Sequence, residues 1–253
     1  SVSAILQRTV FAGSSSRILT SATLAVGPDF GPIKRRLGLD ETVRSLQVSG
    51  GFDYQNQALL YLPRHLPEPF EAGRQAAVAE EIERLATLSM GGGFALFTSY
   101  REMRDAHRRL ESRLPFPCLL QGQESKALLL ERFAQEQPAM LFATMGFWQG
   151  VDLPGDALRL VILDKIPFPP PNDPLFAARC RRVEASGKSS FSELSVPLAA
   201  TALRQGFGRL IRSQTDWGVV SILDPRLVRR GYGRRLIAAL PPARRTQTFS
   251  AVW

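Results

Sequence analysis

A glutamine and two arginines near residue 210 have a spacing that could serve phosphate chemistry. If the segment is helical, offsets of four and seven residues hold Gln205, Arg209 and Arg212 within an arc of roughly 60° on one face. Arginine is always charged, and its planar guanidinium can bind two phosphate oxygens at once. The glycines between Gln205 and Arg209 would let another backbone approach. We therefore interpret this face as a site for a phosphoryl group in transfer. The alternative is an ordinary solvated basic helix face.

Several strings in the sequence resemble the motifs of superfamily-two helicases, in the order and form of the DinG/XPD branch. They are Ser21-Ala22-Thr23-Leu24, Leu96-Phe97-Thr98-Ser99-Tyr100, Phe147-Trp148-Gln149-Gly150-Val151-Asp152-Leu153-Pro154-Gly155, Asp164-Lys165-Ile166-Pro167-Phe168, the arginine segment followed by Asp216-Trp217-Gly218, and Leu223-Asp224-Pro225-Arg226. The resemblance covers nearly the whole chain. Within the branch, the chain is most similar to the bacterial DinG and YoaA helicases.

The resemblance implies a division of the chain and a set of cofactors. Residues 1–24 would end a first motor domain, residues 25–245 would form the second RecA-like motor domain, and residues 246–253 would be a C-terminal tail. The sequence has no G-x-x-x-x-G-K-[ST] loop for nucleotide phosphates and no D-E-x-H string for magnesium. ATP and Mg²⁺ would therefore be held mainly by a missing N-terminal motor domain. An iron–sulfur cluster, common in this branch, would also belong to that half.

The composition favours a large soluble domain with a polyanionic partner. The chain has 253 residues, 44% of them hydrophobic, without a run of roughly twenty apolar residues that could span a membrane. Its net charge of +9 comes largely from arginine clusters, which favours nucleic acid over an acidic protein. Cys118 and Cys180 are far apart and have no C-x-x-C or histidine partner, so we expect reduced thiols, no metal site and a cytoplasmic location.

Apolar runs alternate with amphipathic stretches, which predicts an α/β fold with a mostly parallel sheet covered by helices on both faces. The predicted strands are Arg17–Thr20, Thr42–Val48, Ala58–Leu62, Gly93–Thr98, Cys118–Gln121, Ala139–Thr144, Leu158–Asp164 and Gly218–Leu223. The predicted helices are Phe70–Leu88, Arg101–Leu114, Ser125–Glu136, Asp173–Ala185, Leu194–Arg212 and Gly233–Leu240. In such a fold the functional loops leave the carboxyl ends of the strands.

Two strand ends carry hydroxyl side chains that could contact a nucleic-acid backbone. Thr98 and Ser99 precede a predicted helix, whose first amides favour phosphate, and Tyr100 could stack on a base. Thr144 ends another predicted strand in the same way. The alternatives are a plain helix cap with a packed tyrosine, and a turn threonine. The family motif favours contacts with single-stranded DNA.

The loop after Thr144 carries three further candidates. In related helicases this motif couples the nucleotide to the strand, which implies that Gly150 allows close backbone approach and that Asp152 lies near the ribose or the arginine helix. A carboxylate beside Arg209 or Arg212 would orient a guanidinium. Trp148 could contact DNA or could belong to the core.

The tail has three large apolar residues, Phe249, Val252 and Trp253, and no helix left to join. They either pack back onto the sheet or dock in a partner's groove. The resemblance to YoaA implies a replication partner at this end, such as the chi subunit of the clamp loader of the replicative polymerase.

We therefore interpret the chain as the C-terminal motor half of an ATP-dependent DNA helicase, acting on single-stranded DNA in repair or in the response to replication damage. An autonomous nucleic-acid-binding module, or a partner-docking domain without ATPase coupling, is the alternative. The autonomous module would explain the charge but not the spacing of Gln205, Arg209 and Arg212, and the docking domain would act through the tail.

The missing phosphate loop generates a first prediction. We expect the purified 253-residue chain to show no ATP turnover above background with magnesium and single-stranded DNA, measured as phosphate release. A robust rate that Arg212→Ala abolishes would contradict this reading.

Overall fold

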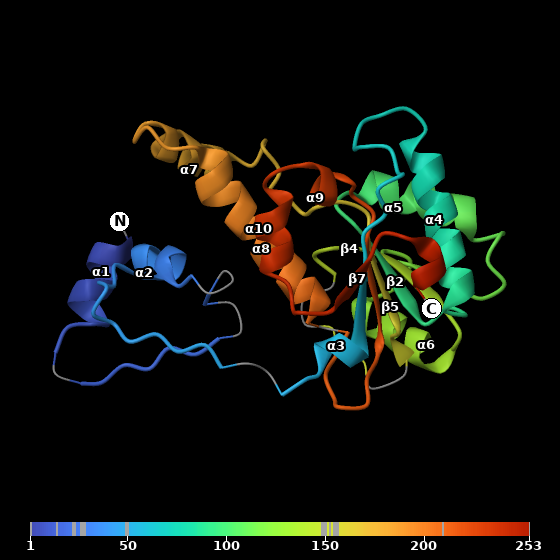
Figure 1. The fold of residues 1–253 in the computed structure, drawn as a ribbon, viewed down its shortest axis with the longest axis horizontal. Helices are drawn as coiled ribbons and strands as arrows, with labels where there is room; N and C mark the ends of the chain where they lie inside the picture. The colour runs from blue at the N-terminus through green and yellow to red at the C-terminus, as the bar shows by residue number, and fades with distance from the viewer. Residues whose placement is uncertain are drawn as a thin grey trace. The chain divides into compact units, whose positions relative to one another are not determined.

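The computed structural model describes residues 2–13, 15–21, 24–25, 29–48, 51–147, 151, 153, 157–208 and 210–252. They form two compact units, Ser1–Gly51 and Phe52–Trp253 (Figure 1). The boundaries that we placed after residues 24 and 245 remain predictions.

The first unit contains two short helices, α1 (Val2–Thr9) and α2 (Gly31–Leu37). They contact each other at Gly38, whose carbonyl accepts a hydrogen bond from the Gln7 side chain. The strands that we expected at Arg17–Thr20 and Thr42–Val48 are not present. A strand requires a bonded neighbour, and the described residues of this unit offer these segments none. Ile18 and Leu46 accordingly lie 89% and 82% exposed.

The second unit is built on a parallel sheet, as the sequence predicted. Among the described residues, seven strands pair in the order β3-β4-β2-β5-β6-β1-β7, and each pairing is parallel. The strands are β1 (Ala58–Tyr61), β2 (Gly93–Phe97), β3 (Cys118–Leu120), β4 (Met140–Thr144), β5 (Leu160–Leu163), β6 (Gly218–Ile222) and β7 (Arg244–Thr246). The first six lie within predicted strands, but β7 was not predicted.

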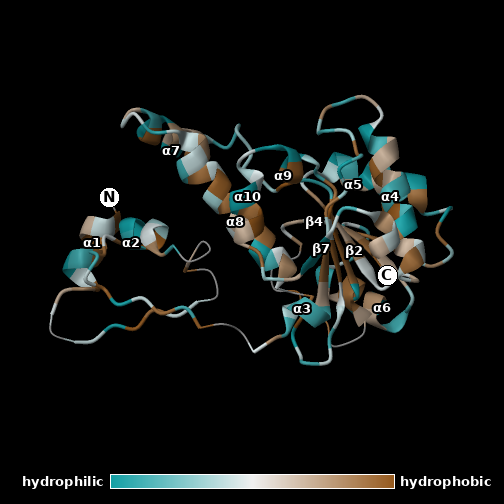
Figure 2. Cartoon of the chain, viewed as in Figure 1, coloured by the Kyte–Doolittle hydropathy of each residue, from teal (hydrophilic) through white to brown (hydrophobic). Residues whose placement is uncertain are grey.

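The core of this unit forms because apolar strands are covered from both faces. All residues of β2, β5 and β6 are buried, and hydrophobic residues dominate the strands at the centre of Figure 2. Such continuous apolar runs are typical of parallel sheets buried on both sides. On one face the side chains of Tyr61, Ala95 and Phe142 pack with Ile82 and Met103 in one hydrophobic cluster.

Most helices of the second unit follow the predictions with shifted ends, but two short ones, Tyr54–Gln57 and Arg226–Arg229, were not predicted. They are α3 (Tyr54–Gln57), α4 (Arg74–Leu88), α5 (Tyr100–Leu110), α6 (Lys126–Gln135), α7 (Pro174–Glu184), α8 (Val196–Phe207), α9 (Arg226–Arg229) and α10 (Gly233–Ala238). Side-chain caps fix three starts: Ser99, Ser125 and Asp173 each accept a hydrogen bond from the backbone of the following turn. The segment 166–173, before α7, is rich in proline and is neither helix nor strand, because proline lacks an amide donor and fixes its own backbone angle.

The tail returns to the sheet. Its first residue, Thr246, ends β7, which pairs with β1. Phe249 lies in a short 3₁₀ helix (Phe249–Ala251), where its ring packs edge-on against Tyr61 at 6.2 Å and under the Arg84 guanidinium at 3.8 Å. Val252 is buried in the same cluster. Of the two alternatives for the tail, the structure has the packed one for Phe249 and Val252, whereas Trp253 lies outside the described residues.

This packing predicts the effect of truncating the tail side chains. Phe249→Ala removes a partly buried ring and its contact with Arg84, so we expect the melting temperature to fall by roughly 5 °C or more. Exposed Gln247→Ala is the matched control and should change it little. If Phe249→Ala melted like the parent in thermal denaturation followed by circular dichroism, the ring would not belong to the core.

Candidate functional site

The candidate residues that the structure describes fall into two clusters at opposite edges of the parallel sheet. Thr98 and Thr144 stand at the carboxyl ends of β2 and β4. Arg212 precedes β6 in the chain and lies at its amino end, where Gln57, just ahead of β1, bonds to the same turn. We expected the functional loops to leave the carboxyl ends of the strands, and that rule did not predict the position of Arg212 at the amino end of β6.

The arginine segment is not one helical stripe. Helix α8 ends at Phe207, and Gly208 is its cap residue. Gln205 is exposed on the last turn of α8, whereas Arg212 lies beyond the helix in a partly buried loop. Glycines at 206 and 208 weaken the helix, and the buried side chains of Leu210 and Ile211 hold the chain after it. The prediction that one helix continues through Arg212 is therefore wrong, because α8 ends at Phe207.

The Arg212 side chain reaches the loop that follows β4. Its guanidinium donates from Nη2 to the carbonyl oxygen of Val151 at 2.6 Å and from Nη1 to that of Leu153 at 3.2 Å. Burial lowers the pKa of this guanidinium, and the Asp216 charge opposes that shift. The two motifs that the sequence suggested would act together are thus joined by direct hydrogen bonds.

Asp216 fixes the backbone of Arg212. Its carboxylate accepts hydrogen bonds from the amides of Arg212 and Ser213, both at 2.8 Å, and from the Ser213 hydroxyl at 2.6 Å. Burial raises the pKa of the Asp216 carboxyl, but these hydrogen bonds outweigh it and the net pKa is lowered. Asp216 therefore remains an ionised acceptor that holds the turn in shape.

Two further residues support this turn: Gln57, which was not singled out from the sequence, and Gly218, which belongs to the Asp216-Trp217-Gly218 motif. The amide nitrogen of the Gln57 side chain donates to the carbonyl oxygens of Ser213 and Asp216, at 2.9 and 2.8 Å. Gly218 begins β6 so close to Arg159 that an added Cβ would lie 2.4 Å from its carbonyl oxygen. The contact of Gln57 could not be predicted from the sequence because its partners, Ser213 and Asp216, are far away along the chain. The close approach of Gly218 to Arg159 explains why glycine follows Trp217 in the motif.

At the carboxyl edge, Ser99 caps α5 and is bonded within it. Its hydroxyl accepts from the amide of Glu102 at 3.3 Å and donates to the Glu102 carboxylate at 3.0 Å. Lys165 forms an ion pair with the same carboxylate. Burial of Glu102 opposes its ionisation, but Lys165 and Ser99 outweigh this, and the pKa of Glu102 is lowered. Beside this cap, Thr98 is exposed and Tyr100 is 52% exposed, so the tyrosine is not packed.

Gln121, which follows β3, joins Tyr100 to Thr144. Its amide nitrogen donates to the Tyr100 hydroxyl oxygen at 3.0 Å. Its amide oxygen accepts from the Thr144 backbone at 2.7 Å and from the Thr144 hydroxyl at 3.0 Å. The structure therefore brings together the two separate strand ends that we proposed for DNA contact. Only the end-of-strand position of Gln121 could have suggested this from the sequence.

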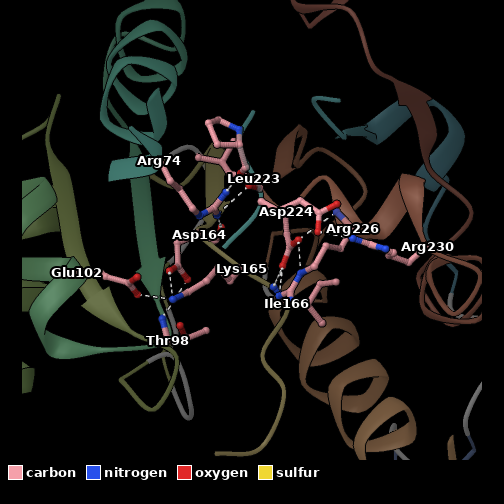
Figure 3. Close-up of polar contacts among 12 residues, drawn as sticks. Arg74, Thr98, Glu102, Asp164, Lys165, Ile166, Leu223, Asp224, Arg226 and Arg230 are labelled. Atoms are coloured by element: carbon pink, nitrogen blue, oxygen red, sulfur yellow. Dashed lines mark hydrogen bonds and ion pairs between the residues drawn. The ribbon is translucent and has the colours of Figure 1, made fainter. Parts of the chain in front are cut away.

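A buried polar network lies behind this edge (Figure 3). Asp164, after β5, accepts from the Thr98 amide at 3.0 Å and lies 3.8 Å from the Lys165 ammonium group. Arg74, buried at the start of α4, donates to the carbonyl oxygens of Asp164 at 2.7 Å and Leu223 at 3.1 Å. Because these carbonyls end β5 and β6, the Arg74 guanidinium clamps two neighbouring strands at the edge of the site.

The last motif string forms a similar support after β6. Asp224 is buried and binds the Arg226 side chain through two bonds, at 2.9 and 2.7 Å. The same carboxylate accepts from the Ile166 amide at 3.0 Å, which fixes the start of the proline-rich segment. Figure 3 shows Asp224 between Ile166 and Arg226. Its role here is to position backbone.

Several predicted site residues lie outside the described residues. They are Trp148, Gly150, Asp152 and Arg209. In the part of the chain that is described, no group of three or more His, Cys, Asp or Glu side chains is arranged to hold a metal ion, and no helix there is long and apolar enough to cross a membrane. Cys118 and Cys180 are free thiols, and burial raises the pKa of Cys118 to about 11.

Comparison with known proteins gives consistent matches. Residues 82–243 match the helicase C-terminal domain family. The chain is 43% identical over 235 residues to the ATP-dependent DNA helicase YoaA of Escherichia coli, covering 93% of this chain and 37% of that protein. It is 41% identical over 255 residues to the ATP-dependent helicase DinG of Mycobacterium tuberculosis, covering 100% of this chain and 38% of that protein. The chain thus spans less than two fifths of these relatives.

Solved structures agree on the fold. The chain is similar to an XPD helicase with a TM-score of 0.60 at 18% identity, over 75% of this chain and 35% of that one. A second, apo XPD structure gives a TM-score of 0.57 at 17% identity, over 85% and 42%. These likenesses show the RecA-like α/β fold and confirm the predicted fold class.

The buried Asp164 carboxyl generates a prediction on pH. Burial is the main cause that raises its pKa to about 7, against the opposing charges of Lys165 and Arg74. An acid whose pKa is raised on folding stabilises the fold at low pH. That contribution is lost as the pH rises from about 4 to about 7.

We therefore expect Asp164→Asn, which keeps an acceptor for the Thr98 amide, to gain stability relative to the parent across this pH window. The gain should be on the order of 3 kcal/mol, measured as the free energy of unfolding in urea at several pH values. Parallel pH profiles for the two proteins would show that Asp164 ionises normally in the folded state.

Proposed function

This chain belongs to the helicase C-terminal domain family, and we propose that it is the second motor domain of an ATP-dependent DNA helicase of the DinG/YoaA type. One observation carries the proposal: the Arg212 guanidinium is bonded to the carbonyls of Val151 and Leu153, in the loop that leaves Thr144. The Arg212 guanidinium, a candidate phosphate-binding group, is thereby connected to Thr144, a candidate DNA contact, through one short segment of the chain.

On the amino-end side, we propose that Arg212 contacts the phosphoryl group of ATP during transfer, with Gln205 and Arg209 beside it. Asp216 and Gln57 support this role because they fix the loop backbone that carries Arg212. A guanidinium held in place before reaction stabilises charge that develops in the transition state without reorganising at that moment. Gly150 and Asp152 are proposed to line the same nucleotide site.

On the carboxyl-end side, we propose that single-stranded DNA crosses the ends of β2, β3 and β4. Exposed Thr98 lies just before α5 and exposed Tyr100 begins it, and the amides of the first turn of α5 favour phosphate. Thr144 joins the same edge through Gln121. Ser99 would contribute the capped start of α5 while its hydroxyl stays bonded to Glu102. Trp148 is proposed to contact a base.

The segment from Thr144 to Leu153 gives this domain a physical means of coupling the two sites. A nucleotide that contacts Arg212 would favour one arrangement of the loop whose carbonyls Arg212 binds. That loop follows directly from the strand end at Thr144. Coupling of this kind requires the loop to have two arrangements whose balance both ligands shift. Movement along DNA with each ATP cycle would follow from that shift.

The proposal implies partners beyond this chain. ATP and Mg²⁺ would be held mainly by an N-terminal motor domain, which would carry any iron–sulfur cluster. A repair or replication-damage role is proposed from the DinG and YoaA relatives. Since Phe249 and Val252 pack against the core, a chi-type clamp-loader subunit would have to bind the exposed residues of the tail.

The arginine role is testable in the complete helicase. We expect Arg212→Ala to lower DNA-stimulated ATP turnover by roughly 10³-fold or more, while the affinity for ATP without DNA and the affinity for DNA without nucleotide stay near those of the parent. Arg212→Lys should recover little of the rate, because an ammonium group cannot make the paired contacts of a guanidinium.

Exposed Arg235, in α10, offers a matched control, and Arg235→Ala should keep the parental turnover. Near-parental turnover of Arg212→Ala would rule out the transfer role. Salt-dependent DNA binding that nucleotide never changes would favour an autonomous binding module instead.

A further inference from the structure

The hydrogen bonds around Gln121 have only one consistent direction. Its amide contacts the Thr144 backbone N–H at 2.7 Å on one side and the Tyr100 hydroxyl at 3.0 Å on the other. A backbone N–H can only donate, so the amide oxygen of Gln121 must face Thr144. The amide NH₂ group must therefore face Tyr100.

This direction fixes the proton of each hydroxyl. The Gln121 oxygen has no proton to give, so the Thr144 hydroxyl, 3.0 Å away, donates its proton to Gln121. The Tyr100 oxygen accepts from Gln121, so the Tyr100 proton must point elsewhere. Within the described part of the chain, Gln121 is the hydrogen-bond partner of the Tyr100 hydroxyl, and Tyr100 is 52% exposed. Tyr100 is thus presented to solvent as a donor, whereas the Thr144 donor is already used.

We propose that Gln121 is a positioning residue that sets Tyr100 as the hydrogen-bond donor to a backbone phosphate of single-stranded DNA. This rests on the proposed function of the carboxyl edge and changes its assignment: Tyr100 contacts phosphate through its hydroxyl, and Thr144 serves to orient Gln121. Phosphate oxygens are acceptors, so a hydroxyl whose proton faces solvent matches them.

The surrounding charge suits an anionic ligand. The guanidinium carbon of Arg104, one turn further along α5, lies 5.9 Å from the centre of the Tyr100 ring. The tyrosine also stands at the start of α5, where the helix dipole favours negative charge. These features attract a phosphate but do not choose which hydroxyl donates, and that choice is made by Gln121.

Gln121→Glu tests the direction of the hydrogen bonds by pH. An ionised carboxylate only accepts, so Tyr100 would turn its proton towards Glu and lose its donor for phosphate. A protonated carboxyl has one acceptor and one donor and so reproduces the amide. Because a glutamate carboxyl titrates at about 4.3, the affinity of the 253-residue chain and of the complete helicase for a fluorescent oligothymidylate would be measured by anisotropy from about pH 8 down to about pH 4.

We expect Gln121→Glu to bind roughly tenfold more weakly than the parent at pH 8 and to approach the parent as the pH falls. Gln123→Glu adds the same charge two residues away on an exposed position and should show a smaller, less pH-dependent loss. Tyr100→Phe should bind weakly at every pH, and adding Gln121→Glu to it should cause no further pH-dependent loss.

The outcomes separate this inference from the function on which it rests. If the parental protein bound no single-stranded DNA, the proposed function would fail and the inference with it. If the parent bound DNA but Gln121→Glu and Gln123→Glu gave the same pH profile, only the Gln121 assignment would be wrong. Weaker binding by Thr144→Val than by Tyr100→Phe would reverse the roles of the two hydroxyls and overturn it.

Discussion

The partly buried guanidinium of Arg212 needs hydrogen-bond acceptors, and this need fixes how two segments of the domain lie against each other. Removing arginine from water is costly unless its N–H groups find acceptors, and Arg212 finds them in the carbonyls of Val151 and Leu153. The loop after β4 must therefore stay beside the turn before β6. Asp216 and Gln57 then hold that turn from the other side. Burial is the main cause of the lowered pKa of the Arg212 guanidinium, against the opposing charge of Asp216.

The parallel sheet separates the two proposed tasks and connects them. Central strands buried on both faces act as rigid spacers, with Tyr100 and Thr144 at one edge and Arg212 at the other. Arg74 and Asp224 hold the carboxyl ends of β5 and β6 at fixed spacing. With that scaffold fixed, the loop after β4 contacts both proposed sites. Ligand binding at one site can therefore change the affinity of the other.

Sequence patterns predicted the sheet because burial on both faces leaves unbroken apolar runs, such as those of β2 and β5. Ser99 and Asp173 likewise marked helix starts, since a cap acts within one turn. The end of α8 was missed because its glycines were read as access for a ligand and not as helix breakers. Short β7 has two arginines and no apolar pattern, and its register depends on pairing with β1. Gln57 and Gln121 were missed because their contacts are made by residues distant in the sequence.

We propose that Arg212 transmits the nucleotide state to the edge of the sheet where Tyr100 and Thr144 are proposed to meet DNA. The most direct test is the affinity of the complete helicase for single-stranded DNA with and without a non-hydrolysable ATP analogue, for the parent and for Arg212→Ala. If Arg212 couples the two sites, the analogue changes the affinity of the parent for DNA, and Arg212→Ala keeps the nucleotide-free affinity but loses this change. An equal response to the analogue in both proteins would contradict it.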